Sequence, residues 1–305
     1  MSSIKEQIIQ KARDLNIDKI GFAEIAELND AKVISQQLYE QERFANCNYL
    51  FNNLSYRANP KLLMPAAKSA IAFAVNYFTD LHHSPEAKGK ISRHAWGRDY
   101  HGILREKANA MKEFIKEKFD EDSFISIDGG KVFEKLWAER CGIGWQGKNS
   151  LLITREYGSW VFLGVIFTSL EIEPEDPHPN LCGSCNKCRS SCPNNAIIAD
   201  KIVDIRKCIA FLTIEDRKNE YWQADSKSAG YLYGCDLCQD VCPFNQKILH
   251  SNHSDFQAVN SESFIEPEAV LQFTKDDFDN RFRDSSIKRI GVKKLQANAT
   301  NIIKE

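Results

Sequence analysis

Eight of the ten cysteines in this 305-residue chain lie between residues 182 and 242, and their spacing restricts what this region can fold around. The first run, CGSCNKCRSSCP, contains Cys182, Cys185, Cys188 and Cys192. The second run, YGCDLCQDVCP, contains Cys235, Cys238 and Cys242. The first run matches the C-x2-C-x2-C-x3-C-P pattern of bacterial ferredoxins, and the second lacks only its first cysteine, where Leu232 stands. The pattern predicts two 4Fe–4S clusters, which need one thiolate more than the two runs contain.

The ligands of each cluster follow from the way such runs bind. In two-cluster ferredoxins the fourth cysteine of a run binds the cluster of the other run. We therefore predict that the first cluster is bound by Cys182, Cys185, Cys188 and Cys242. The second cluster is then bound by Cys192, Cys235, Cys238 and one further cysteine. Cys47, Cys141 and Cys208 remain as candidates, and we assign Cys208 because the other two precede the cysteine-rich region.

Zinc is the alternative explanation for these cysteines. Four thiolates around Zn²⁺ account for C-x2-C pairs. They do not account for a complete run of x2, x2 and x3 spacing that ends in proline. Disulfides would also account for many cysteines, but they are rare in reducing compartments such as the cytoplasm. Two features of the sequence favour a cytoplasmic location. No apolar stretch approaches the length of a membrane span, and the N-terminal amphipathic pattern lacks the apolar centre of a signal peptide.

The net charge of −2 gives the whole chain no attraction to nucleic acid, although a local basic patch can still provide it. We expect a cytoplasmic monomer without a membrane partner. The basic stretch RFRDSSIKRIGVKK (281–294) is the strongest concentration of positive charge in the sequence. A solvated helix face is the simpler interpretation of such a stretch.

Helical and strand patterns alternate over the first 170 residues. SAIAFAVNYF (69–78) predicts a buried strand, and residues 98–119 predict a long amphipathic helix. SLLIT and WVFLGVIFTSLEI predict two later strands, with REYG as a hairpin turn between them. The expected class is α+β, with an α/β domain at 1–172, a ferredoxin-like two-cluster domain at 173–250 and a basic helical segment at 251–305.

The loop GIGWQGKN (142–149) matches two phosphate-binding patterns, G-x-G-x-x-G and G-x-x-x-x-G-K. Both patterns bind phosphate only where a strand leads into the N-terminus of a helix. Here the predicted helix precedes the loop and the strand follows it. We interpret the loop as a glycine-rich turn, which can also let a large flat ligand approach the backbone.

Several motifs in fixed order resemble epoxyqueuosine reductase. They are SRHAWGRDYH, IDGGKVFEKLWAERCGIGWQGKNSLLIT, the complete cysteine run, CIAFLTIEDR and GCDLCQDVCPFN. The resemblance implies a cytosolic oxidoreductase that uses cobalamin and two 4Fe–4S clusters to reduce epoxyqueuosine to queuosine at the wobble position of tRNA. It also implies a cobalamin-binding domain similar to that of reductive dehalogenases. The C-terminal helical-repeat extension of longer members is missing here.

The resemblance also implies roles for individual residues. Asp128 matches the catalytic acid, which donates best when burial raises its pKa; the alternative is a helix N-cap. The implied cobalamin contacts are Arg57, Arg93, Asn149 and Leu152. The implied tRNA contact is Arg217, and the basic stretch adds Lys288, Arg289, Lys293 and Lys294 as predicted phosphate contacts.

Two departures from the family pattern, Lys131 and His94, weaken the implied cobalamin contacts. No D-x-H-x-x-G signature is present, so we expect cobalamin without a protein histidine on cobalt. His101 is then an ordinary polar residue of the long helix. The alternative functions are a cobalamin-dependent reductive dehalogenase of small molecules and an electron-transfer module without catalysis. The electron donor is not identified by the sequence.

Overall fold

The structure is a computed structural model that describes residues 2–84, 86–258 and 263–305. The elements up to residue 168 are α1 (Ile4–Asp14), β1 (Lys19–Glu24), α2 (Asn29–Glu40), α3 (Tyr49–Asn52), α4 (Leu54–Ala58), β2 (Ser69–Asn76), β3 (Lys90–Ile91), α5 (Tyr100–Phe119), β4 (Ser123–Ser126), α6 (Glu134–Arg140), β5 (Trp145–Gln146), β6 (Leu152–Ile153) and β7 (Val161–Thr168). The later ones are α7 (Lys187–Ser190), β8 (Ile197–Ala199), β9 (Ile202–Val203), α8 (Ile209–Ile214), β10 (Tyr231–Tyr233), α9 (Leu237–Asp240), α10 (Pro267–Leu271), α11 (Lys275–Arg281) and α12 (Gly291–Lys304). Short 3₁₀ turns include η2 (Arg93–Ala95) and η6 (Ser286–Ile290).

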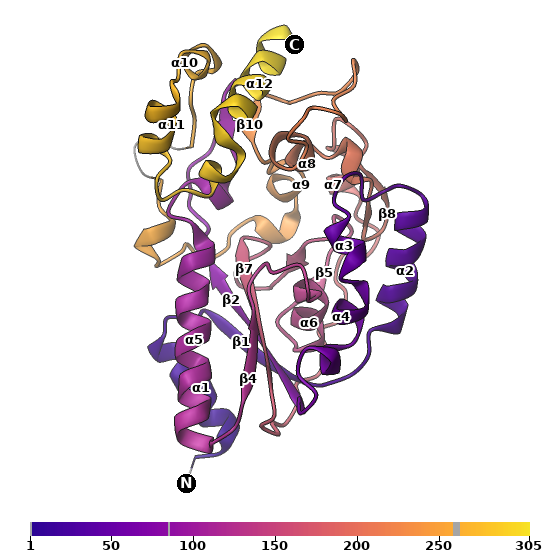
Figure 1. The fold of residues 1–305 in the computed structure, drawn as a ribbon, viewed down its shortest axis with the longest axis vertical. Helices are drawn as coiled ribbons and strands as arrows, with labels where there is room; N and C mark the ends of the chain where they lie inside the picture. Colours follow the sequence, from indigo (N-terminus) through magenta and orange to yellow (C-terminus); the bar gives the residue numbers. More distant parts are fainter. Residues whose placement is uncertain (1, 85, 259–262) are drawn as a thin grey trace.

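The first part of the chain is built on a four-stranded antiparallel sheet in the order β1-β2-β7-β4. All eight residues of the central strand β2 are buried, as the apolar pattern predicted. Successive side chains of a strand point to opposite faces. Ile71, Phe73 and Val75 therefore join the core beneath α1 and α5, whereas the alanines between them join the core beneath α6. Figure 1 shows helices covering both faces of this sheet.

The long predicted helix is present as α5, with one correction at its start. It begins at Tyr100, and the Asp99 side chain caps it by accepting a hydrogen bond from the backbone N–H of His101. Its buried residues include Leu104, Ala108 and Met111, so the amphipathic pattern identified the buried face.

The prediction of a hairpin between SLLIT and WVFLG is wrong. The strand β6 pairs with β5, and β7 pairs with β2 and β4. REYG does make a tight turn, closed by a bridge between Thr154 and Gly158, but it does not start a ladder between β6 and β7. Two apolar strands separated by a turn pattern look the same in sequence whether they pair with each other or with distant partners.

The C-terminal segment packs onto earlier parts of the chain. Its residues Phe278, Ile287 and Leu295 share one apolar core with Trp96 and Leu232. The strand β10 pairs in parallel with β3, which lies in the predicted first domain. The predicted boundaries at 172 and 250 therefore lie between segments that share packing. The described residues contain no helix long and apolar enough to cross a membrane.

Candidate catalytic and cofactor site

The structure brings the predicted ligands of the first cluster around one small cavity. The cavity is lined by Cys182, Cys185, Cys188 and Cys242, with Lys148, Asn149 and Phe244 among its other lining residues. The run curls because a backbone hydrogen bond joins the N–H of Cys185 to the carbonyl of Cys182, and the short helix α7 follows. Cys242 reaches this cavity from the second run, as the exchange of fourth ligands between runs requires.

The predicted ligands of the second cluster also lie near one another. Burial raises the pKa of Cys235, Cys238 and Cys208, and the neighbouring thiols add to the effect. Cys208 raises the pKa of Cys235 and of Cys238, and Cys192 raises that of Cys208. Thiols that affect each other's pKa are within electrostatic range, so these four side chains lie near one another. Cys188 also raises the pKa of Cys238, so this second group lies beside the first.

The two remaining cysteines lie elsewhere. Cys141 is fully buried in the core beneath α6, where its Sγ donates to the carbonyl of Ala70 at 3.6 Å. Cys47 is 5% exposed and packs against Phe211 and Leu212. Of the three candidates, only Cys208 has cluster cysteines among the groups that shift its pKa. This placement supports the choice of Cys208 as the eighth ligand.

Asp128 lies two residues beyond β4, in the turn that leads towards α6. Its φ of +47° is a left-handed conformation that Asp tolerates better than most residues. Its Oδ2 accepts a hydrogen bond from the Tyr100 hydroxyl at 2.8 Å and contacts Nε2 of His101 at 3.1 Å. The helix α6 begins at Glu134 with Phe133 as its N-cap, so the alternative interpretation of Asp128 as a helix cap is wrong.

His101 connects Asp128 to a second carboxylate. Its Nδ1 lies 2.6 Å from Oδ1 of Asp99, so the imidazole bridges two acids. Sequence analysis placed His101 as an ordinary polar residue, which the structure corrects. The triplet Asp99-Tyr100-His101 at the start of α5 was visible in the sequence, but nothing in it indicated that two of its side chains meet Asp128. Tyr100 was not assigned any role either.

The two bridged groups have opposite pKa shifts. The hydrogen bond from His101 holds the pKa of Asp128 at about 2, against the opposing effect of burial. The Asp128 side chain is 56% exposed, so burial is the weaker influence. Hydrogen bonds to Asp128 and Asp99 raise the pKa of His101 to about 9. The Asp128 carboxylate therefore lacks the raised pKa that favours a proton donor, because a cationic partner stabilises its charged form.

A cavity of about 770 Å³ lies near this turn, between α2, α4 and α6. Arg57 lines it, and its guanidinium stacks on the ring of Phe133 at 4.3 Å. Nε and Nη1 of Arg57 are buried and have no hydrogen-bond partner. Two unpaired donors in an open cavity fit a large ligand with polar substituents. Lys135, Arg140 and Lys201 also line the cavity, so its lining includes four cations beside five carboxylates.

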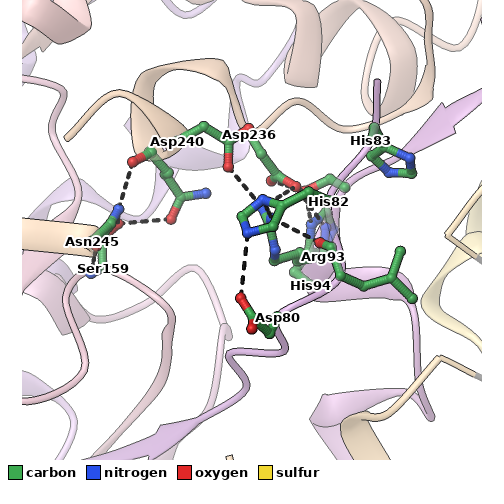
Figure 2. A network of polar contacts seen from close by, with 12 residues as sticks. Asp80, His82, His83, Arg93, His94, Ser159, Asp236, Asp240 and Asn245 are labelled. Atoms are coloured by element: carbon green, nitrogen blue, oxygen red, sulfur yellow. Dashed lines mark hydrogen bonds and ion pairs between the residues drawn. The ribbon is translucent and has the colours of Figure 1, made fainter. Parts of the chain in front are cut away.

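Arg93 lies in a buried polar network and does not line the large cavity (Figure 2). Its side chain is 3% exposed, and Nη1 donates to Oδ1 of Asp240 at 2.7 Å. The backbone N–H of Arg93 donates to Asp236, which also accepts from the Ser92 hydroxyl. Asp236 and Asp240 lie between cysteines of the second run, so Arg93 ties that run to the 3₁₀ turn η2. Its Nε is buried and has no hydrogen-bond partner.

Asn149 and Leu152 also lie away from the large cavity. The side-chain amide of Asn149 donates to the carbonyl of Cys238 at 3.5 Å and lines the small cavity of the first thiol group. Leu152 is 3% exposed and packs in the core beneath α6. Of the four predicted cobalamin contacts, Arg57 is the one that lines the large cavity.

The predicted tRNA contacts divide into exposed and buried side chains. Arg217, Lys288 and Lys293 are exposed. Lys294 is 3% exposed, and its Nζ donates to the carbonyl of Leu212 at 2.7 Å and to Asn219. Burial lowers the pKa of Lys294 to about 8. Lys294 is therefore corrected from a phosphate contact to an interior residue that anchors α12.

Arg289 lies nearer to Asp128 than its sequence position suggested. Its guanidinium pairs with Glu215 and helps to lower the pKa of Asp128. The 3₁₀ turn η6, which carries Arg289, therefore lies within electrostatic range of the Asp128 turn. Arg289 from the C-terminal segment and Asp128 from the first part of the chain thus contribute to one site.

Comparison with known proteins gives consistent results. The family model described as epoxyqueuosine reductase QueG, DUF1730, matches residues 57–128, and a 4Fe-4S double cluster binding domain matches residues 181–245. Epoxyqueuosine reductase of Atelocyanobacterium thalassa is 38% identical over 304 residues, covering 98% of this chain and 99% of that protein. The Synechocystis enzyme is 41% identical over 256 residues, covering 81% of this chain and 89% of that protein.

Solved structures agree with the sequence relatives. Epoxyqueuosine reductase crystallised with an epoxyqueuosine-modified tRNA-Tyr stem loop has a TM-score of 0.88 at 31% identity, over 98% of this chain and 80% of that one. A Bacillus subtilis structure, described with its catalytic loop swung out of the active site, has a TM-score of 0.85 at 30% identity, over 98% of this chain and 81% of that one.

These relatives confirm the resemblance and the α+β class, and the double-cluster match decides between iron–sulfur clusters and zinc. Membership also brings an oxidoreductase activity on tRNA, and the double-cluster match brings two 4Fe–4S clusters. The chain belongs to the epoxyqueuosine reductase family.

Proposed function

We propose that this chain reduces epoxyqueuosine to queuosine in tRNA at the site formed by Asp128, its partners and the large cavity beside them. The observation that carries the proposal is the arrangement around Asp128. An exposed carboxylate, a bridging histidine and unpaired Arg57 donors in a nearby cavity are brought together by α4, α5 and the turn before α6. A small-molecule dehalogenase and an electron-transfer module do not account for the relatives.

The clusters would be held by the two thiol groups. Cys182, Cys185, Cys188 and Cys242 would hold the first, and Cys192, Cys208, Cys235 and Cys238 the second. The shared cavity of the first group and the mutual pKa effects of the second support this division. When bound, the clusters supply single electrons and the cobalamin supplies a reduced cobalt centre.

Arg57 would hold cobalamin from the large cavity. Its two unpaired donors match the amide and phosphate acceptors of that cofactor, and the Phe133 ring fixes the guanidinium. Asn149 would hold the loop 142–149 against the second cysteine run through the carbonyl of Cys238. The loop packs closely here, since a Cβ at Gly147 would lie 2.6 Å from Cδ1 of Ile153 and 2.8 Å from Oδ1 of Asn149.

Asp128 would donate the proton that lets the epoxide oxygen leave. The carboxylate is the most exposed member of its hydrogen-bonded group, at 56% against 45% for Asp99 and 20% for His101, so substrate can reach it. Tyr100 and His101 hold it in place from α5. A positioned acid of this kind contributes about 10² to 10⁴ in rate.

The tRNA would be held by exposed cations on one side of the site. The proposed contacts are Arg217, Lys288, Arg289 and Lys293, and Arg289 connects them electrostatically to Asp128. RNA loops are recognised through unpaired bases and phosphates, so the wobble nucleotide would leave the loop to reach Asp128. We also keep as proposals a cytoplasmic location, a monomeric state and an electron donor of unidentified kind.

The test is turnover of an epoxyqueuosine-containing anticodon stem loop by anaerobically reconstituted protein, followed by mass spectrometry of the nucleosides. Wild type should form queuosine with loss of one oxygen. Asp128→Asn should keep cobalamin and cluster absorbance but lose turnover by about 10² to 10⁴. Wild type that binds both cofactors and leaves the RNA unchanged would contradict the proposed function. Near-normal turnover by Asp128→Asn would remove its role as donor.

A further inference from the structure

We propose that His101 stores the proton that Asp128 delivers, and that Asp99 positions His101 for this transfer. The inference rests on the proposed function and deepens it, because it identifies where the proton comes from. Asp128 remains the catalytic residue, and His101 acts through it. None of the roles implied by the family resemblance involved Asp99 or His101.

The geometry fixes the imidazole at both nitrogens. Nδ1 lies 2.6 Å from Asp99, and Nε2 lies 3.1 Å from Asp128. Oδ1 of Asp99 also accepts the backbone N–H of His101 at 3.0 Å, so this carboxylate is anchored by the start of α5. The His101 ring stacks on Tyr100 with centroids 4.1 Å apart, and Tyr100 stacks on Phe162 at 4.1 Å. The Nε2 proton is therefore directed at Asp128.

The surrounding charges favour a cationic imidazole. His101 faces two carboxylates, and its side chain is 20% exposed. The other charged or titratable groups around the pair include Tyr100 and Arg105 from α5, His94 from η2 and Arg289 from η6. Four more groups interact electrostatically with Asp128 from the side of α3, α4 and α6, namely Tyr49, Arg57, Glu134 and Lys135. Burial lowers the pKa of His94 to about 4, so it does not compete as a cation at neutral pH.

The proton balance of the reaction explains why storage matters. Converting an epoxide to an alkene breaks two C–O bonds, forms one C=C bond and releases oxygen as water, which consumes two electrons and two protons. With a pKa of about 2, Asp128 alone holds no proton at neutral pH, whereas His101 with a pKa of about 9 holds one. His101 passes this proton to Asp128, which transfers it to the leaving oxygen. The second proton comes from water through the exposed carboxylate.

The experiment compares pH profiles of single-turnover reduction in reconstituted holoenzyme on the stem loop. Wild type should be nearly flat from pH 6 to 8 and should fall only above about pH 9, where His101 loses its proton. In His101→Gln the Tyr100 hydroxyl keeps its proton across this range because burial raises its pKa, so the acid that titrates is Asp128, with a pKa no higher than its ordinary value of about 4. Its rate should therefore fall about tenfold per pH unit across the same range, as expected for one titrating acid.

Asp99→Asn is the second variant, and it tests the positioning role without removing the imidazole. Loss of the Asp99 charge should move the basic limb of the profile to lower pH. His250→Gln is the matched control, because His250 is an exposed histidine that contacts Phe78, and its profile should equal that of wild type. Cobalamin absorbance, iron content and stem-loop affinity are measured for every variant.

The outcomes separate the two proposals. If the pH profile of His101→Gln matches that of wild type, His101 does not store the proton. If the basic limb of the Asp99→Asn profile lies at the wild-type pH, Asp99 does not position His101. Wild type that fails to reduce epoxyqueuosine at every pH overturns the proposed function itself. A profile change accompanied by loss of cobalamin or iron would assign His101 to cofactor binding and would also overturn the inference.

Discussion

The sheet of the first part of the chain and the cysteine-bearing region at residues 181–245 are stabilised in different ways. The sheet has a central strand in which every residue is buried, and its two faces form two large apolar cores. The cysteine-bearing region contributes to two small apolar groups, one around Trp145 and Cys242 and another around Phe211. Its residues Ile214, Leu232 and Tyr233 join a larger core, which they share with the C-terminal segment. Both of the small groups include residues from the first part of the chain. The first region can fold through apolar burial alone, whereas the second depends on its neighbours and its ligands.

The difference affects function as well as stability. The sheet places α5 and the Asp128 turn, so the proposed proton chemistry rests on the region with the larger cores. The cysteine runs would supply electrons from the region with less core, and Asp236 and Asp240 tie the second run to the buried Arg93. The site therefore lies where a core-stabilised region meets a ligand-stabilised one.

The largest effect that separates the two regions should come from Cys208→Ala. Loss of this thiolate should remove one cluster and lower iron from about eight to about four per chain. The measurement is iron and sulfide content after anaerobic reconstitution. Cys141→Ala is the matched control, since Cys141 lies in the core of the first region. If Cys141→Ala lost iron and Cys208→Ala did not, the ligand assignment would be wrong.

Phe73→Ala should affect the other region. Phe73 is 1% exposed in β2, and its ring fills the space over Gly164 in β7. Truncation should lower the free energy of unfolding by about 3–5 kcal/mol. Urea unfolding followed by circular dichroism measures this change, and iron per folded chain should stay at the wild-type value. A coupled loss of clusters in folded protein would show that the two regions are not independent.

The exposed cations of the C-terminal segment should produce a smaller effect. Replacing Lys288 and Lys293 with Ala should weaken stem-loop binding and reduce the slope of log affinity against log salt by about 1.4, for two contacts to single-stranded RNA. Lys112→Ala with Lys118→Ala is the control, because these exposed lysines lie on α5. An unchanged slope in the first pair would leave Arg217 and Arg289 as the proposed contacts.

The smallest expected effect is the pH dependence of stability from the His101–Asp128 pair. His101 has a raised pKa of about 9 against 6.5, so its contribution is complete below pH 6.5 and is lost as pH rises through 9. Asp128 has a lowered pKa of about 2 against 3.8, so its contribution is present above pH 3.8 and is lost as pH falls through 2.

The stability difference between wild type and His101→Gln should therefore be greatest between pH 4 and 6.5 and should shrink towards pH 10. Because both groups are partly exposed, solvent screening keeps the effect small. Urea unfolding across this pH range measures it. A difference that stays constant with pH would mean that the pair carries no charge interaction.

The sequence predicted those features of the fold and the site that depend on residues close together in the chain. Three features could be predicted from residues within about two helical turns or one strand of each other. They are the first cysteine run, the buried strand at 69–78 and the apolar face of α5. The choice of Cys208 required only its position within a cysteine-rich segment. Asp128 came from the family resemblance, and its location at the end of a strand agrees with it. Arg57 was placed in the same way and lines the cavity.

The sequence by itself determined the cluster motifs, the element types and the family, because these follow from local spacing and periodicity. Only the tertiary structure decided the pKa shift of Asp128, since its partner His101 is 27 residues away along the chain. It also decided that Lys294 is interior, because its acceptor on Leu212 is 82 residues away, and that β7 pairs with β2 instead of β6. Such contacts depend on how elements pack together, and no local pattern of charge or polarity specifies them.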